Sequence, residues 1–179
     1  MPTESIRMLR GVRQTREFQD RPVPDDALRD ILEVARWSGS SRNSQPWELV
    51  VIADRATLQR LAELIPFGKF LARAPLGIAV VMHGAGQGQS LDAGRIAERM
   101  MIAAHARGLG AGLATIPDPA LERQALDLLG VPAGHSLGVA LAFGLPAARD
   151  PAAAKRPGAG RRPLGEVVHY DRFGQRSPS

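Results

Sequence analysis

A polar run of ten residues, SGSSRNSQPW at Ser38–Trp47, does most to constrain how this chain folds. The residues before it place apolar side chains at helical positions i, i+3, i+4 and i+7, namely Leu28, Ile31, Leu32 and Ala35. The residues after it, Glu48–Ala53, are typical of a buried strand. A helix and a strand therefore meet at a loop rich in hydroxyls and amides. Proteins that combine helices and sheets often hold ligands at such a junction.

Helices and strands follow one another along the rest of the chain. Apolar periodicity and capping residues predict helices at Glu4–Arg10, from Asp25 and Asp26 onward, and at Ala56–Ile65, Leu91–Arg107 and Asp118–Leu129. Continuous β-prone apolar runs predict buried strands at Leu76–Met82 and Leu137–Phe143. The glycine-rich bend His83–Gln89 leads into the longest helix, whose wide apolar face predicts a place in the core. Trp47 is expected to open a strand as a core residue.

The C-terminal region predicts a long connection followed by a structured tail. Residues 145–163 form a loop rich in proline, alanine, arginine and glycine, and residues 164–175 regain apolar and aromatic character. A loop of about 18 residues is unusual inside a compact domain. We therefore expect one domain over residues 1–179 whose tail packs at a distance, on a partner subunit.

Composition excludes several kinds of chemistry. The chain has no cysteine, which removes disulfides, thiolate nucleophiles and zinc–sulfur sites. His83, His105, His135 and His169 do not show metal-ligand spacing, and no G-x-S-x-G motif for a serine hydrolase occurs. No apolar run approaches the ~18 residues of a membrane span, and the N-terminus lacks the apolar core of a secretory signal. We expect a cytoplasmic protein without a membrane partner.

The charge leaves a second class of function open. The 23 basic and 18 acidic residues give a net charge of +5, which is compatible with a nucleic-acid-binding module. Almost all the basic residues are arginine, which suits phosphate contacts, although genome composition is a simpler explanation. No basic platform interleaved with aromatic residues is present, so we expect no nucleic acid partner.

Four motifs, in order, resemble those of the flavin-dependent nitroreductase family. They are RQTREF at Arg13–Phe18, the loop at Ser38–Trp47, GLGAGLATIP at Gly108–Pro117 and GAGRRPLGEVV at Gly158–Val168. The loop matches the family pattern at Ser40, Asn43, Gln45, Pro46 and Trp47, whereas Gly39 stands where the family usually has proline. The first motif also departs from the family, because Gln14 occupies the usual hydroxyl position and Thr15 sits beside it.

The resemblance implies which residues bind FMN. Arg13 and Gln14 would contact the ribityl-phosphate side, and Arg16 would lie near N1 and O2 of the ring, where a cation stabilises reduced flavin. Hydroxyl and amide groups would be supplied by Ser40, Ser41 and Asn43, the backbone at N5 by Thr115 and Ile116, and the phosphate contact by Arg161 or Arg162. Simpler interpretations remain. The arginines of the first motif are solvated, the serines and the asparagine form a turn cluster, and the last motif is an exposed basic loop.

The resemblance also implies a fold, a mechanism and a partner. The fold is α+β, with a mostly antiparallel central sheet flanked by helices and the C-terminal segment exchanged across a homodimer. The implied enzyme uses NADH or NADPH to reduce FMN at N5 and then reduces a nitroaromatic, quinone or similar oxidant by a ping-pong mechanism, without a catalytic side chain. A flavin carrier or sensor without efficient turnover is the alternative.

One departure concerns the cover over the flavin. Family members with well-described nitro substrates carry an aromatic-bearing helical insertion, but this chain has only His83–Gln89 after the strand Leu76–Met82. The pocket is therefore either more open or closed by Pro66–Phe70.

Overall fold

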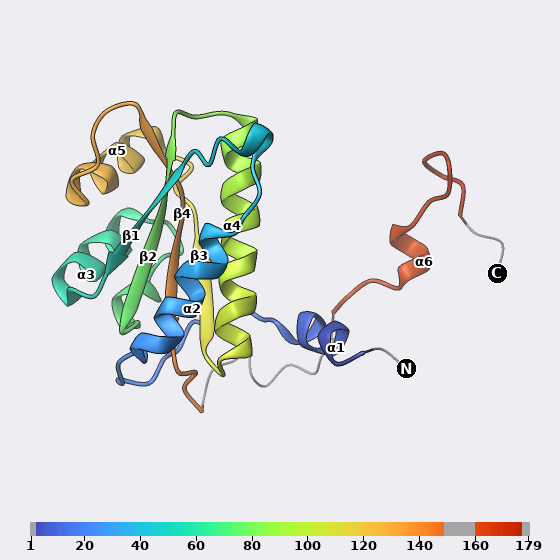
Figure 1. Ribbon diagram of the computed structural model, residues 1–179, viewed down its shortest axis with the longest axis horizontal. Coiled ribbons are helices and arrows are strands. Elements are labelled where there is room, and N and C mark those ends of the chain that lie inside the picture. The colour runs from blue at the N-terminus through green and yellow to red at the C-terminus, as the bar shows by residue number, and fades with distance from the viewer. Residues whose placement is uncertain (1–2, 149–159, 177–179) are drawn as a thin grey trace.

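The computed structural model of the chain describes residues 3–148 and 160–176 (Figure 1). Its helices are α1 (Glu4–Gly11), α2 (Asp25–Arg36), α3 (Arg55–Leu64), α4 (Gln87–Ala106), α5 (Pro119–Leu128) and α6 (Leu164–Val167). Its strands are β1 (Trp47–Ile52), β2 (Leu76–His83), β3 (Gly110–Ala114) and β4 (His135–Gly144). Two short 3-10 turns are η1 (Ser41–Asn43) and η2 (Leu71–Arg73).

The strands form one sheet in the order β1-β2-β4-β3, and all three neighbouring pairs are antiparallel. The central strand β2 is buried from Leu76 to Met82, which agrees with its continuous apolar sequence. A β-bulge lies opposite Val80 and Val81, where Gly138 of β4 packs closely under Ala93. The predicted α+β class and the predicted antiparallel sheet are confirmed.

Helices cover both faces of this sheet (Figure 1). α2 and α4 pack on one face, where Ile31, Ile96 and Met100 meet Ile78 and Leu141. α3 and α5 pack on the other face, where Leu58, Leu61 and Leu126 are fully or almost fully buried. The two faces separate because successive strand residues point to opposite sides. The predicted core position of α4 is confirmed by eight buried residues along it.

Most element boundaries follow local capping chemistry. Asp118 accepts hydrogen bonds from Ala120 and Leu121 N–H at the start of α5, and Pro119 stands at its first position. α4 begins at Gln87 rather than at the predicted Leu91, so the glycine-rich bend is shorter than expected. Its polar first turn hides the apolar periodicity, and Gly86 provides the backbone turn with a φ of 152°.

The glycine-rich run after α4 forms the edge strand β3, which the sequence did not predict. The segment at Gln14 runs parallel to this strand, and Thr15 N–H donates to the Ala111 carbonyl at 2.8 Å. A Cβ on Gly110 would overlap the Thr15 side chain, and a Cβ on Gly112 would overlap the Thr15 carbonyl. These two glycines therefore allow the N-terminal segment to lie against the sheet edge.

The described part of the tail projects away from the layered body (Figure 1). Residues 149–159 of the predicted loop lie outside the described residues. The tail side chains Leu164, Val167, Tyr170 and Phe173 are all exposed, and no residue of α6 is buried.

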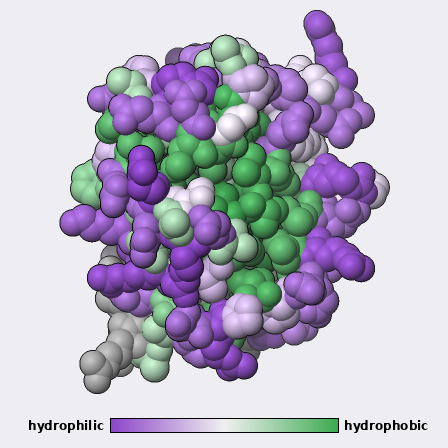
Figure 2. Space-filling view, turned by 90° about the vertical axis from the view of Figure 1, so that its left-hand side faces the viewer, coloured by the Kyte–Doolittle hydropathy of each residue, from purple (hydrophilic) through white to green (hydrophobic). Residues whose placement is uncertain are grey.

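A second apolar surface lies on the body, on the side of α3, β1 and α5 (Figure 2). Partly buried apolar side chains that pack against the core on this face of the sheet include Val50, Leu64, Leu121, Leu128 and Leu129. Contiguous exposed apolar surface is typical of contact with another polypeptide.

Candidate functional site

The polar loop after α2 has an unusual backbone. Arg42, Asn43 and Gln45 have φ values of 52°, 54° and 47°, in the left-handed region that non-glycine residues rarely adopt. Ser40 holds the loop by accepting the Gln45 N–H on its hydroxyl oxygen at 2.8 Å. The buried Ser38 hydroxyl has no hydrogen-bond partner among the described residues. A loop kept in strained geometry is a common property of ligand sites.

α4 fixes the position of this loop. Arg99 donates to the Trp37 carbonyl at 2.9 Å, and the Arg95 guanidinium lies against Gly39. A Cβ on Gly39 would lie 2.8 Å from Arg95 Nη2. A side chain at this position would require the flexible end of Arg95 to move.

The end of α2 adds a charged anchor to the same loop. Hydrogen bonds from Arg36 and then from the Trp37 indole lower the pKa of Glu33 to about 2. Glu33 is therefore ionised at neutral pH and holds the Trp37 side chain at the start of the loop. Trp47 opens β1, as predicted, but it is only partly buried against the α2–α4 core rather than a core residue.

The first motif lies at the other end of α4. Arg13 donates to the carbonyls of Arg10 and Val12 at 2.8 and 2.7 Å. Thr15 is buried against β3, whereas Arg16 is exposed and lies 3.5 Å from the Gln14 amide oxygen. The burial of Thr15 shows that its side chain packs against the protein, whereas Gln14, the polar neighbour of Arg13, is partly buried.

A basic cavity of about 640 Å³ joins the first and last motifs. Its lining includes Arg7, Arg10, Arg13 and Arg161, together with Glu98. Arg13 and Arg161 are thus brought together from opposite ends of the sequence. Arg162 does not line this cavity, because it is held by the side chain and the carbonyl of Glu166 at 3.4 and 2.7 Å. Of these two arginines, Arg161 is therefore the one that faces the cavity.

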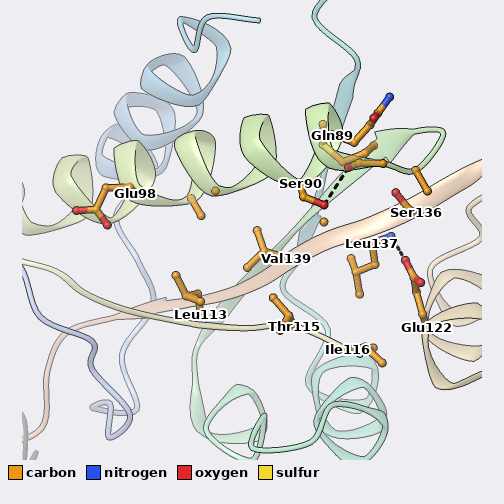
Figure 3. Close-up of a pocket in the computed structure, with 16 residues that line it drawn as sticks. Gln89, Ser90, Glu98, Leu113, Thr115, Ile116, Glu122, Ser136, Leu137 and Val139 are labelled. Atoms are coloured by element: carbon orange, nitrogen blue, oxygen red, sulfur yellow. Dashed lines mark hydrogen bonds between the residues drawn. The ribbon is translucent and has the colours of Figure 1, made fainter. Parts of the chain in front are cut away.

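A second cavity of about 450 Å³ lies between α4, β4 and the end of β3 (Figure 3). Thr115 and Ile116 line it, with Thr115 exposed and Ile116 mostly buried. The bend after β2 contributes Ala85 and Gly86 to its wall and the first turn of α4 contributes Gln89, whereas no residue of Pro66–Phe70 lines it. Of the two alternatives predicted for the pocket, closure by Pro66–Phe70 therefore has no support at this cavity.

Most of the predicted site residues lie in three places within one chain, namely the polar loop, the basic cavity and the cavity at Thr115 and Ile116. Ser40, Ser41 and Asn43 line none of the cavities described above or below. Gly39 lies against Arg95 and Gly11 against His105, ten positions further along α4, which is about 15 Å of helix. Within one chain the polar loop and the first motif are therefore separated along α4.

Sequence reasoning missed several residues of these cavities. Arg7 and Arg10 precede Arg13 at three-residue intervals, a spacing that could have indicated one shared basic face. Glu98 lies on the exposed side of α4 and Arg95 packs on the loop. Among the described residues, no group of three His, Asp or Glu side chains is placed to hold a metal ion. In that same part of the chain no helix is long and apolar enough to cross a membrane.

Comparison with known proteins identifies relatives over most of the chain. A relative in Archaeoglobus fulgidus, named as an NADH dehydrogenase/NAD(P)H nitroreductase, is 28% identical over 135 residues, which cover 72% of this chain and 78% of that protein. A nitroreductase from Desulfovibrio desulfuricans, solved in complex with FMN, is 30% identical with a TM-score of 0.76, over 97% of this chain and 99% of that one. An FMN-dependent nitroreductase from Clostridium difficile R20291 has a TM-score of 0.83 at 24% identity, over 94% and 99% of the two chains.

The family model described as the Nitroreductase family matches residues 9–66 and 67–145. This match contains the first three motifs and every strand of the sheet. The chain belongs to the Nitroreductase family, as its motifs predicted.

Proposed function

We propose that this chain is an NAD(P)H-dependent FMN oxidoreductase that reduces a nitroaromatic, a quinone or a similar small oxidant by a ping-pong mechanism. Family membership and the named relatives support an oxidoreductase that uses FMN and NAD(P)H. The observation that carries the proposal is the basic cavity, where Arg13 and Arg161 meet although they lie far apart in sequence.

The residues present fit FMN. Guanidinium groups are the preferred partners of a phosphate dianion, and four arginines line one cavity. The polar loop carries strained backbone and a buried hydroxyl without a partner among the described residues, as expected where an outside ligand completes the contacts. The glycines of β3 let the segment that carries Arg13, Gln14 and Arg16 lie at the sheet edge.

Each predicted residue has a role in binding and orienting the cofactor. Arg13 and Arg161 would hold the phosphate, Gln14 the ribityl chain, and Arg16 the N1 and O2 edge of the ring. Backbone groups at Thr115 and Ile116 would lie beside N5. When bound, FMN supplies a ring that accepts hydride and gives it up again, so the protein needs no nucleophile of its own. The residues around it position both substrates and exclude water.

We further propose a homodimer in which one domain, residues 1–179, supplies both halves of the site. Ser40, Ser41 and Asn43 of one subunit would complete the site built by Arg13 and Arg161 of the other. The separation of the two groups along α4 supports this arrangement. The exposed apolar side chains of the tail support contact with the second subunit.

The proposal is tested by titration of the apoprotein with FMN. We expect about one FMN per subunit with a dissociation constant in the micromolar range or below, followed by bleaching of the bound flavin when NADPH or NADH is added without oxygen. Absence of FMN binding in that range would contradict the proposal. Binding without reduction by either nucleotide would favour a flavin carrier or sensor instead.

Arg16→Ala is expected to lower the reduction potential of the bound flavin by about 30–60 mV, because a cation beside N1 and O2 stabilises the negative charge gained on reduction. Arg161→Ala should behave differently, since a phosphate contact stabilises oxidised and reduced cofactor alike. Its FMN affinity should fall while its potential stays nearly constant. Spectroelectrochemical titration of both flavin-loaded variants measures the difference. An unchanged reduction potential in Arg16→Ala would show that Arg16 does not lie beside the flavin ring.

A further inference from the structure

Glu98 occupies a central position among three neighbouring cavities. It lines the basic cavity with Arg13 and Arg161, and it lines the second cavity with Thr115 and Ile116. It also lines a third, open cavity of about 470 Å³ over the exposed face of α4, between Ser90 and Arg99. Whatever lies in any of these spaces therefore lies close to this carboxylate.

The charges of the first two cavities are opposite. Arginines dominate the basic cavity, whereas the ionisable residues of the cavity at Thr115 and Ile116 are Glu98 and Glu122, with no lysine, arginine or histidine in its described lining. Figure 3 shows the two glutamates at opposite ends of that cavity. An acidic cavity stands out in a chain whose net charge is +5.

The two glutamates differ in whether the carboxylate already has a hydrogen-bond partner. Glu122 accepts the Leu137 N–H at 2.6 Å, so its carboxylate has a structural partner. The Glu98 side chain forms no hydrogen bond or ion pair within residues 3–148 and 160–176. Its charge is available to a ligand rather than to another side chain.

We propose that Glu98 sets the charge preference of the oxidant site, favouring cationic and neutral aromatic oxidants over anionic ones. The inference rests on the proposed function, which places the reactive edge of the flavin at Thr115 and Ile116. An oxidant in this cavity of about 450 Å³ must bring its substituents near Glu98 or Glu122. A carboxylate on the oxidant is repelled there, and a quaternary ammonium group is attracted.

The anionic reductant does not conflict with this preference. The phosphate groups of NAD(P)H lie far from its nicotinamide ring, and the reduced ring itself is uncharged. Loss of hydride makes that ring positive, so an acidic cavity also suits the oxidised nucleotide.

The size of the effect follows from Coulomb's law. At about 7 Å, and with an effective dielectric constant between those of a protein surface and water, one unit charge changes affinity roughly threefold to tenfold. Because Glu98 is exposed, the lower part of that range applies and added salt should weaken the effect. A cation and an anion of the same shape differ by two unit charges, so their ratio should change about tenfold.

The experiment compares three nitroarenes of similar shape on the flavin-loaded enzyme: 4-nitrobenzoate, 4-nitrobenzyl alcohol and 4-nitrobenzyltrimethylammonium. Their kcat/KM values are measured with the wild type, Glu98→Gln and Glu63→Gln. Dissociation constants of benzoate, benzyl alcohol and benzyltrimethylammonium, which lack the nitro group, are measured from changes in the flavin absorbance. Glu63 lies exposed on α3, across the sheet from α4, so Glu63→Gln makes the same change in net charge away from the cavity.

Wild type should prefer the cation to the anion, and Glu98→Gln should reduce the cation-to-anion ratio about tenfold in both kcat/KM and affinity. Glu63→Gln should leave both ratios within twofold of wild type. Unchanged ratios in Glu98→Gln, or equal changes in the two variants, would overturn the inference while flavin binding and turnover of the neutral compound still support the proposed function. A chain that takes up no FMN overturns both.

Discussion

Truncation after Pro146 is expected to give a protein that keeps its three-layer fold but neither dimerises nor retains FMN. The deletion removes the apolar tail and Arg161, which lines the basic cavity. Leu164 is 76% exposed and Phe173 is 94% exposed, so neither contributes to the core of its own chain. Packing on a second subunit would bury these apolar side chains and so explain why the tail contains them.

The fold itself should survive this truncation. Both core clusters consist of residues before Pro146, and Gln19 N–H still donates to the Leu145 carbonyl. The far-ultraviolet circular dichroism of the truncated protein should therefore resemble that of the full chain. Loss of the dimer without loss of secondary structure separates a defect in assembly from a defect in folding.

Sedimentation and flavin absorbance measure the outcome, and two full-length variants separate its causes. The double variant Leu164→Ser, Phe173→Ser keeps Arg161 and should weaken the dimer, whereas Arg161→Ala should remain a dimer with weaker FMN binding. A truncated protein that still sediments as a flavin-loaded dimer would show that the tail is not the dimer contact.

The elements predicted most accurately are those whose own side chains determine them. The stripe Leu28, Ile31 and Ala35 and the cap at Asp118 placed α2 and α5 correctly within one or two residues. β2 was recognised because both of its faces are buried, which makes its sequence continuously apolar. The start of α4 was predicted four residues too late, because its first turn contains glutamine, glycine and serine instead of apolar residues.

β3 was missed because the residues that form it are determined by packing against a segment far away in the chain. GAGLA lacks β-branched residues and contains two glycines, so local propensity argues against a strand. The glycines are required by the approach of Thr15, which the sequence alone does not reveal. Gly39 likewise lies against a residue distant in sequence, because Arg95 comes from a helix more than fifty residues later.

The motifs predicted individual residues of the candidate site. They did not predict which of these residues lie together in space. Patterns within a few residues found Arg13, Ser40 and Asn43, but they could not show that Arg161 rather than Arg162 joins Arg13 in the basic cavity. Glu98 carries no motif, and its importance arises from its position among the cavities.

Gly112→Ala is expected to destabilise the protein by about 1–3 kcal/mol and to weaken FMN binding at least tenfold, because an added methyl group has no space in this packed region. The new Cβ would overlap the Thr15 carbonyl and lie 3.1 Å from the Phe70 ring. A backbone carbonyl cannot rotate away as a side chain can. The segment from Arg13 to Arg16 must therefore move off β3, and its flavin-binding side chains move with it.

Gly88→Ala is the matched control for this change. Gly88 lies in the first turn of α4, and a Cβ there would have no atom within 4 Å. Its stability should stay the same or rise by up to about 1 kcal/mol, because alanine favours helix more than glycine does. Urea denaturation of the apoprotein and titration with FMN measure the two effects separately. If Gly112→Ala matches Gly88→Ala in both measurements, the N-terminal segment is not held against β3, and the cavity that joins Arg13 to Arg161 loses its structural basis.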